Sequence, residues 1–551
     1  MPGLPPHIHN IADVLDHAAD ARPDHPALRD RTHDGYAAWT YRELADKAYA
    51  VAALVRCHGG IAQGDRVGVL MPNCRWWGAA FFAALAADAV VVPLDTRLTE
   101  RELVAIAVRA GLRVLVTTRS MLDRATAVSA ACPCVQQVVP VDDIALPPGA
   151  PRRERRRLLN DPAVIIFTSG TTGAPKGVVL THGNLLVDIY ELLEVLEVTP
   201  QEQFVSILPL NHAYEITGGF MSAMCLCATV TYACSMRPDA IVDTMRESGM
   251  SVMMVVPAFL RMLVGRIKSA AGARGGRVFA VLFRVSLMLT RVGVPAGRVL
   301  FRRIRRALSP RFRGFVCGGA PLDPELLREA HALGLTVLQG YGITEASPVI
   351  TVNRLTENVP GSVGRPLPSL ELKIVRAREG REGEGELWVR GASVFHGYFD
   401  NDEDTRNAFH GGWFKTGDLA RISRGGHVYI SGRIKNVIVN EGGKNIYPED
   451  IEHVLQRCPI VQDVCVVGIA ARDQGEAPVA VVVAKKELLH ERGFPDAGSA
   501  AAYVKEQLQP FIRSLAEYQR PRAVHVWDEL PKTHTLKIKR FEVAERVKKE
   551  G

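Results

Sequence analysis

The 551-residue sequence has no uncharged apolar run of about 18 residues, the length that a membrane-spanning helix needs. The longest candidate, Trp76–Pro93, is interrupted by Asp88. The first residues, Met1–Ile11, include two histidines and three prolines and lack the apolar core of a signal peptide. We therefore expect a cytoplasmic protein, with peripheral contact at the inner membrane face as a further possibility.

Cysteine is scarce and lacks metal-binding spacing. Only two C-x-C pairs occur among the ten cysteines, Cys132/Cys134 and Cys225/Cys227, and no histidine follows at ligand distance. Buried free thiols in a reducing compartment are the favoured interpretation. With 47% hydrophobic and 23% charged residues, the chain resembles an ordinary globular protein with a large core.

The formal net charge of +8 raises the question of nucleic-acid binding. The sequence contains no zinc-finger spacing, no aromatic RNA-binding strand and no basic-region helix. Nucleic acid is therefore not an expected partner.

Strand-like and helix-like segments alternate through the first two thirds of the chain. This order predicts an α/β fold with a large N-terminal domain of parallel βαβ layers. The expected buried strands are Asp65–Met71, Ala89–Pro93, Val114–Thr117, Val164–Thr168, Phe204–Leu208, Val252–Val256, Gly314–Cys317 and Thr336–Gln339. Short alternating strands after about Leu370 predict a β-rich subdomain, and a compact, mobile α+β domain follows. The predicted domains are 1–433 and 434–551.

The most informative segment is Ile165–Gly177, IIFTSGTTGAPKG, where a buried strand enters a loop rich in glycine and hydroxyl groups. Glycines let backbone N–H groups approach an anion, and a lysine adds positive charge. The candidate phosphate-binding residues are Thr168, Ser169, Gly170, Thr171, Thr172, Gly173 and Lys176. The spacing is not that of a Walker A motif, which disfavours a kinase. By composition alone, a surface turn remains an alternative.

The segment TSGTTGAPKG resembles the signature of the acyl/aryl-CoA synthetase, adenylation-domain and luciferase superfamily of AMP-binding enzymes. The chain looks most like the long-chain fatty-acyl-CoA synthetases within it. The resemblance implies that this loop holds the β- and γ-phosphates of ATP.

Further motifs follow in the order of that family. In VCGGAPL, Gly318, Gly319 and Ala320 would lie against adenine. The segment GYGITEASP resembles the motif that closes over the nucleotide. Its expected contacts are made by Gly340, Tyr341 and Gly342 around adenine, Thr344 at the α-phosphate, and Glu345 at Mg²⁺.

Three further resemblances concern the ribose, the acid and the hinge. Asp418 in WFKTGDL and Arg433 in SGRIK match the residues that hold the ribose hydroxyls. His212 in LPLNHAYE matches a residue near the substrate carboxylate. Lys435 aligns with the hinge between the two half-reactions, although Asn436 replaces the acid common there.

The C-terminal motifs concern the two half-reactions themselves. Gly443 in GGKNIYPE would let the pantetheine arm pass. Lys537 in LPKTHTLKIKR matches the adenylation lysine, although Leu536 precedes it where glycine is common, and Lys532 and Lys539 compete for the role.

These resemblances imply an ATP-dependent ligase that joins a carboxylic acid, in particular a medium- or long-chain fatty acid, to a thiol. ATP, Mg²⁺ and CoA, or phosphopantetheine on an acyl-carrier protein, are the expected cofactors. An acyl-AMP ligase or a carrier-protein ligase of the same fold is the alternative. The expected catalytic residues are Lys537, His212, Thr344 and Glu345.

The segment 261–313 contains fourteen lysines and arginines and no acidic residue. Apolar residues alternate with arginines at helical spacing in Phe279–Thr290 and Val299–Leu308. This pattern predicts a basic amphipathic surface suited to an anionic membrane, and a solvated pair of arginine-rich helices is the alternative.

Overall fold

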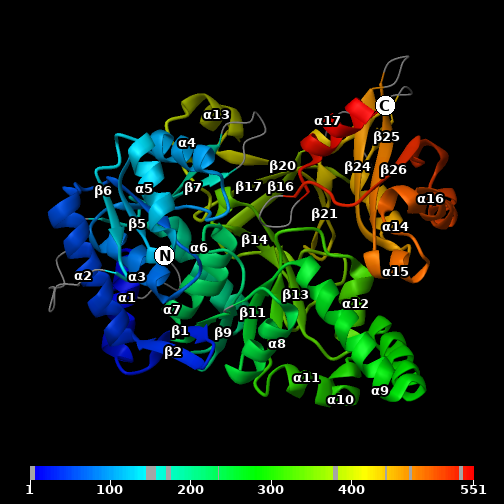
Figure 1. The fold of residues 1–551 in the computed structure, drawn as a ribbon, viewed down its shortest axis with the longest axis horizontal. Helices are drawn as coiled ribbons and strands as arrows, with labels where there is room; N and C mark the ends of the chain where they lie inside the picture. Colours follow the sequence, from blue (N-terminus) through cyan, green and yellow to red (C-terminus); the bar gives the residue numbers. More distant parts are fainter. Residues whose placement is uncertain are drawn as a thin grey trace. The chain divides into compact units, whose positions relative to one another are not determined.

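The computed structural model describes residues 7–143, 157–168, 175–233, 235–375, 383–440, 444–470, 475–532 and 538–550. The chain forms two compact units (Figure 1). The first unit comprises Met1–Glu371 and Val389–Phe414, and the second comprises Leu372–Trp388 and Lys415–Gly551. No helix of the described residues is long and apolar enough to cross a membrane.

The first unit contains a nine-stranded and a seven-stranded sheet. The nine-stranded order is β15 (Arg365–Pro366), β14 (Val349–Val352), β13 (Val337–Gly342), β12 (Gly314–Cys317), β11 (Val252–Val255), β9 (Gln203–Ser206), β10 (Thr229–Tyr232), β1 (Pro26–Thr32) and β2 (Gly35–Thr40). The seven-stranded order is β18 (Gly397–Tyr398), β8 (Lys176–Thr181), β7 (Pro162–Thr168), β4 (Val90–Pro93), β3 (Arg66–Leu70), β5 (Leu112–Thr117) and β6 (Gln137–Pro140). The inner strands pair in parallel, as predicted, and antiparallel strands complete the edges.

Helices connect and cover these strands. They are α1 (Ile11–Ala21), α2 (Tyr41–Gly59), α3 (Arg75–Ala86), α4 (Glu100–Ala110), α5 (Leu122–Ala131), α6 (His182–Leu196), α7 (Ser222–Cys225), α8 (Pro238–Glu247), α9 (Pro257–Arg291), α10 (Gly297–Leu300), α11 (Arg302–Leu308), α12 (Pro324–Ala332) and α13 (Asp402–Ala408). Local sequence fixes several boundaries. Thr99 and Glu102 form a capping box at the start of α4, and Gly111 ends that helix with φ of +59°.

One hydrophobic core of the first unit joins α8, α9 and α12 to strands β11, β12 and β13. Phe259 of α9 packs edge-on against Phe315 of β12, and Leu327 of α12 is fully buried in the same core. This packing holds the ends of neighbouring parallel strands in fixed positions, which is where α/β proteins place ligands.

The second unit contains β16 (Leu370–Val375), β17 (Gly385–Gly391), β20 (Trp413–Ile422) and β21 (Val428–Arg433), which form a small sheet and have most of their residues in this unit. A three-stranded sheet follows, with β24 (Val461–Ala470), β25 (Glu476–Ala484) and β26 (Ala523–Trp527). The remaining elements are β22 (Ile438–Val439), β23 (Asn445–Ile446), α14 (Pro448–Leu455), α15 (Lys486–Glu491), α16 (Ala497–Ser514) and α17 (Arg540–Glu550).

This division differs from the predicted boundary at 433/434, because β20 and β21 pair with each other and group with the C-terminal residues. The predicted boundary marks where the compact α+β pattern begins in the sequence, and it stays a prediction.

Candidate active site

The predicted phosphate loop connects two antiparallel strands. Strand β7 ends at Thr168 and β8 begins at Lys176, and these two residues are paired across the hairpin. The Thr168 hydroxyl donates to the Lys176 carbonyl at 3.4 Å. A Walker A loop leads from a strand into a helix, whereas the segment after β7 leads into a second strand, β8, so it does not have the Walker A arrangement. The loop residues Ser169, Gly170, Thr171, Thr172 and Gly173 lie outside the described residues.

Lys176 lies in a polar chain that extends to Glu345. Its ammonium group is 2.7 Å from Asp404 Oδ2 and 5.5 Å from the centre of the Tyr398 ring. The Tyr398 hydroxyl donates to Glu345 Oε1 at 2.9 Å. Burial and the neighbouring Glu345 carboxylate raise the pKa of Tyr398, so its hydroxyl keeps its proton as a donor.

Strand β18 places Tyr398 in this chain. Residues Gly397 and Tyr398 pair with β8, the strand that begins at Lys176. The motif analysis did not identify Tyr398 or Asp404, because neither lies in a recognised motif. Tyr398 belongs to β18 and Asp404 to α13, and their positions in the sequence do not indicate that Lys176 lies beside them.

The predicted adenine motifs lie at the ends of neighbouring strands. Gly318 follows β12, and Gly340 lies in β13, the parallel neighbour of β12. A Cβ atom at Gly318 would come within 3.3 Å of the Tyr214 ring. Gly319 has φ of +78°, which favours glycine, and Ala320 after it is exposed.

The segment GYGITEASP folds back on itself. A Cβ atom at Gly342 would lie 1.8 Å from the carbonyl oxygen of Pro348, so no side chain fits there. Residues Thr344–Ala346 form a single 3₁₀ turn, which leaves Thr344 and Glu345 half-buried. Tyr341 precedes this turn in β13 and is half-buried as well.

The segment LPLNHAYE lies over the same strand ends. The Tyr214 hydroxyl donates to the carbonyl of Val316 in β12 at 2.8 Å. The structure therefore brings the segment that contains His212 close to Gly318. His212 is half-buried, and its Nε2 is 3.4 Å from Asn211 Nδ2.

Glu215 is a buried acid beside His212 for which the sequence analysis assigned no role. It is 1% exposed and opens a π-helical turn, Glu215–Met221, which is a rare form often found at functional sites. A Cβ atom at Gly219 would come within 2.4 Å of its carboxylate, so a larger residue there would displace the Glu215 side chain. Burial raises the pKa of Glu215 well above its usual range.

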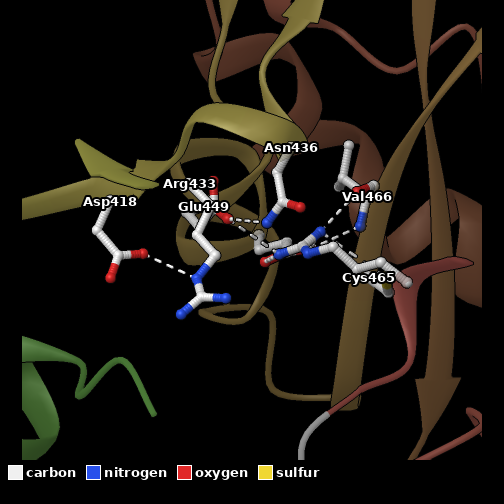
Figure 2. A network of polar contacts seen from close by, with 8 residues as sticks. Asp418, Arg433, Asn436, Glu449, Cys465 and Val466 are labelled. Atoms are coloured by element: carbon white, nitrogen blue, oxygen red, sulfur yellow. Dashed lines mark hydrogen bonds and ion pairs between the residues drawn. The ribbon is translucent and has the colours of Figure 1, made fainter. Parts of the chain in front are cut away.

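The predicted ribose residues form an ion pair within the second unit. Asp418 of β20 and Arg433 of β21 face each other across the two strands, and Arg433 Nε is 2.8 Å from Asp418 Oδ1 (Figure 2). Asp418 is 3% exposed, whereas the Arg433 side chain is 58% exposed. The exposed guanidinium and the fixed carboxylate are suited to polar contact with a ligand hydroxyl.

A second polar network begins at Asn436, shortly after Arg433 in the chain (Figure 2). Asn436 Nδ2 donates to Glu449 Oε1 at 3.1 Å, and Arg540 lies 3.4 Å from the same oxygen. Arg540 also binds both carboxylate oxygens of Glu452, at 2.6 and 2.7 Å. Asn436, at the position where the family commonly has an acid, is thus fixed to α14, while Lys435 is exposed.

The two predicted C-terminal site residues, Gly443 and Lys537, lie outside the described residues. The two competing lysines both have ion-pair partners. Lys532 Nζ is 2.7 Å from Asp463, and Lys539 Nζ is 2.8 Å from Glu542. Lys537 stays the predicted adenylation lysine.

Glu345 is suited to share a Mg²⁺ ion with a nucleotide. The described residues include no group of three histidine, cysteine or acidic side chains that could enclose a metal ion. Magnesium bound to nucleotides commonly takes one or two protein carboxylates and completes its shell with phosphates and water. A single half-buried carboxylate that is oriented by Tyr398 fits that requirement.

Two family models match the chain: "AMP-binding enzyme" over residues 15–399, and "AMP-binding enzyme C-terminal domain" over 450–537. The chain is 31% identical to the long-chain-fatty-acid–CoA ligase FadD15 of Mycobacterium bovis, over 84% of this chain and 80% of that protein. It is 29% identical to a feruloyl-CoA synthase of Amycolatopsis, over 93% and 94% of the two chains. A solved structure of o-succinylbenzoate CoA synthetase from Bacillus subtilis, in complex with its acyl-adenylate intermediate, is 26% identical with a TM-score of 0.78 and coverage of 97% and 98%.

Proposed function

The chain belongs to the AMP-binding enzyme family, and from that premise we propose that it activates a medium- or long-chain fatty acid and transfers the acyl group to CoA. It is an AMP-forming acid–thiol ligase that uses ATP, Mg²⁺ and CoA. The fatty-acid substrate and the roles of individual residues are the proposed part.

Adenylation needs concentrated positive charge. The carboxylate attacks the α-phosphorus of ATP, the bond to the β-phosphate oxygen breaks, and pyrophosphate leaves. Because the attacking and leaving groups are both anionic, fixed cations and N–H donors lower the barrier. No general base is required, since the acid is already ionised at neutral pH.

We assign the triphosphate to the loop 168–176, with Lys176 at the β- and γ-phosphates. Glu345 would hold Mg²⁺, which neutralises phosphate charge when bound, and the Tyr398 hydroxyl keeps that carboxylate oriented. Thr344 is assigned to the α-phosphate, and Lys537 to the charge that develops during adenylation.

The remaining assignments concern nucleoside, acid and thiol. Gly318, Gly319, Ala320, Gly340, Tyr341 and Gly342 are assigned to adenine. Asp418 and Arg433 are assigned to the ribose, and His212 to the acid. Gly443 is assigned to the pantetheine path, along which the thiol attacks the acyl carbonyl and AMP leaves.

The surface of α9 supports a fatty-acid substrate that is taken from a membrane. Four apolar residues of α9 and the residue that directly follows the helix are spaced three or four positions apart and form an exposed stripe (Figure 1 shows α9). The stripe consists of Val278, Val281, Val285, Met288 and Val292, which are 46–74% exposed.

The opposite side of α9 packs on the protein. Ser286 donates to the Ala332 carbonyl of α12 at 2.7 Å, and Lys268 pairs with Glu329 at 2.7 Å. The stripe therefore faces away from the core of its own unit. Apolar residues flanked by arginines are typical of helices that lie on anionic membranes.

Exposed arginines occur on α9 itself and on α11. Arg277 and Arg284 of α9 are exposed, as are Arg302, Arg303 and Arg306 of α11, whereas Arg305 is half-buried. A surface that combines these charges with apolar side chains would both attract an anionic lipid face and insert into it.

The substrate is tested with purified enzyme, ATP and Mg²⁺, by measuring pyrophosphate release for acids of increasing chain length and for ferulate. We expect the highest kcat/KM with a medium- or long-chain acid. A preference for ferulate would contradict the fatty-acid proposal and favour an aryl substrate. Supplying CoA or a holo-acyl-carrier protein in parallel reactions identifies the acceptor, and CoA is the expected one.

The membrane surface is tested by sedimentation with vesicles that contain anionic lipid. Replacing Val281, Val285 and Met288 by serine should reduce vesicle binding and turnover of membrane-dissolved long-chain acid, but not turnover of a soluble short-chain acid. The matched control replaces Val108, a 56%-exposed valine on α4, by serine. Failure of the wild type to sediment at low salt would contradict membrane contact.

A further inference from the structure

The ammonium group of Lys176 already has an anionic partner from its own chain. Asp404 Oδ2 lies 2.7 Å from Lys176 Nζ, and the two side chains are 34% and 22% exposed. The hydrogen bond from Lys176 lowers the pKa of Asp404, which keeps this carboxyl group ionised at neutral pH.

Asp404 is held in place by its local structure. Asn401 caps α13 by accepting from the Asp404 backbone N–H at 3.1 Å, and Asn401 Nδ2 donates to Asp404 Oδ2 at 2.7 Å. The next residue, Thr405, accepts from the backbone N–H of Tyr398 at 2.9 Å. The start of α13 thus fixes the acid beside Lys176 and also ties it to the strand that carries Tyr398.

Asp404 lies close to the position where a bound triphosphate would place its negative charge. Tyr398 links Lys176 to Glu345, so phosphates that share Mg²⁺ with Glu345 would lie within reach of Lys176. A phosphate oxygen bound to Lys176 Nζ would be about 5.5 Å from Asp404 Oδ2 at most, because a charge-assisted hydrogen bond spans about 2.8 Å. Two anions at that separation repel each other.

We propose that Asp404 is a resident counter-ion that competes with the phosphates of ATP and of pyrophosphate for Lys176. It weakens the binding of both, and it re-forms its ion pair when pyrophosphate leaves. The inference rests on the proposed phosphate-binding role of Lys176.

The test measures equilibrium binding of MgATP by calorimetry, and inhibition by pyrophosphate, for Asp404→Asn. The asparagine keeps the shape of the side chain and its hydrogen bond from Asn401, but removes the charge. Since an exposed ion pair is worth about 0.2–1 kcal/mol, we expect the Kd of MgATP to fall about 1.4- to fivefold. The inhibition constant of pyrophosphate should fall by a similar factor.

Two further variants make the result decisive. Glu403→Gln removes one charge from an exposed neighbour on α13 and should leave both constants unchanged. Lys176→Ala should weaken MgATP binding, and wild-type affinity in that variant would overturn the proposed role of Lys176 together with this inference.

If Lys176→Ala binds weakly but Asp404→Asn binds no more tightly than wild type, the inference alone is overturned, and Asp404 serves to orient the lysine. Equal tightening by Glu403→Gln and Asp404→Asn would also overturn it, because the effect would then come from net charge and not from competition for Lys176.

Discussion

We expect that replacing Arg540 destabilises the second unit more than replacing any other of its charged residues. It joins three elements, since it begins α17, binds Glu452 of α14 through both carboxylate oxygens, and donates to the carbonyl of Val466 in β24 at 2.7 Å (Figure 2). Replacing it by methionine keeps much of the aliphatic stem and removes all of these hydrogen bonds. Glu452 would then lose its cationic partner.

The expected cost follows from how far the pair is buried. Removing one partner of a fully buried ion pair costs about 3–5 kcal/mol. The Arg540 and Glu452 side chains are 25% and 16% exposed, so water partly solvates the remaining carboxylate. We therefore expect Arg540→Met to destabilise the second unit by about 2–3 kcal/mol, a large share of the typical 5–15 kcal/mol of a domain.

Hydrogen–deuterium exchange of β24 measures this cost where it arises. The backbone N–H of Val466 donates to Glu452 Oε1 at 2.7 Å, so the peptide that contains Val466 reports on the network directly. A loss of about 2–3 kcal/mol should speed exchange of protected amides there by about 30- to 150-fold. Peptides from the seven-stranded sheet of the first unit should exchange as in the wild type.

The double variant Arg540→Met/Glu452→Leu provides the sharpest check, because removing both charges leaves no unpaired group and should restore much of the stability. Lys548→Met is the control, since Lys548 makes an exposed ion pair on the same helix and should change exchange little. Unchanged exchange in Arg540→Met, or a double variant as unstable as the single one, would refute the reasoning.

Two other predictions concern the reaction. Tyr398→Phe removes the donor to Glu345 and should raise the Mg²⁺ concentration needed for half-maximal pyrophosphate release by about tenfold or more, since a hydrogen bond to a charged group contributes about 1.5–3 kcal/mol. An unchanged Mg²⁺ dependence would contradict the role of Tyr398. Lys537→Ala should slow adenylate formation by roughly 10²–10³ while sparing thioester formation from supplied acyl-AMP, and equal loss of both steps would favour Lys532 or Lys539.

The sequence was most informative where one short pattern determines one element. The expected strands Asp65–Met71 and Val252–Val256 contain β3 and β11, because hydrophobic patterning acts locally. That the segments around His212 and Gly318 lie together is a finding of the structure, because their separation in the sequence does not indicate it.

Contacts between distant segments could not be predicted in this way. Nothing in the composition of α13 indicates that Asp404 pairs with Lys176, because that contact depends on how β18 pairs with β8. The sequence likewise predicted a basic amphipathic surface in this region, but only the packing of α9 on α12 shows which side is covered and that the stripe from Val278 to Val292 faces outward.

The order of protein synthesis gives the Arg540 network a further consequence. Arg540 follows Val466 by 74 residues, so the ribosome makes Glu452 and strand β24 well before their cationic partner. Glu452 precedes Arg540 by 88 residues, so at about 5–20 residues per second the acid stays without that partner for about 4–18 s. During this interval the nascent second unit is expected to remain only loosely packed, exposing apolar strands such as β25 to chaperones or to other chains.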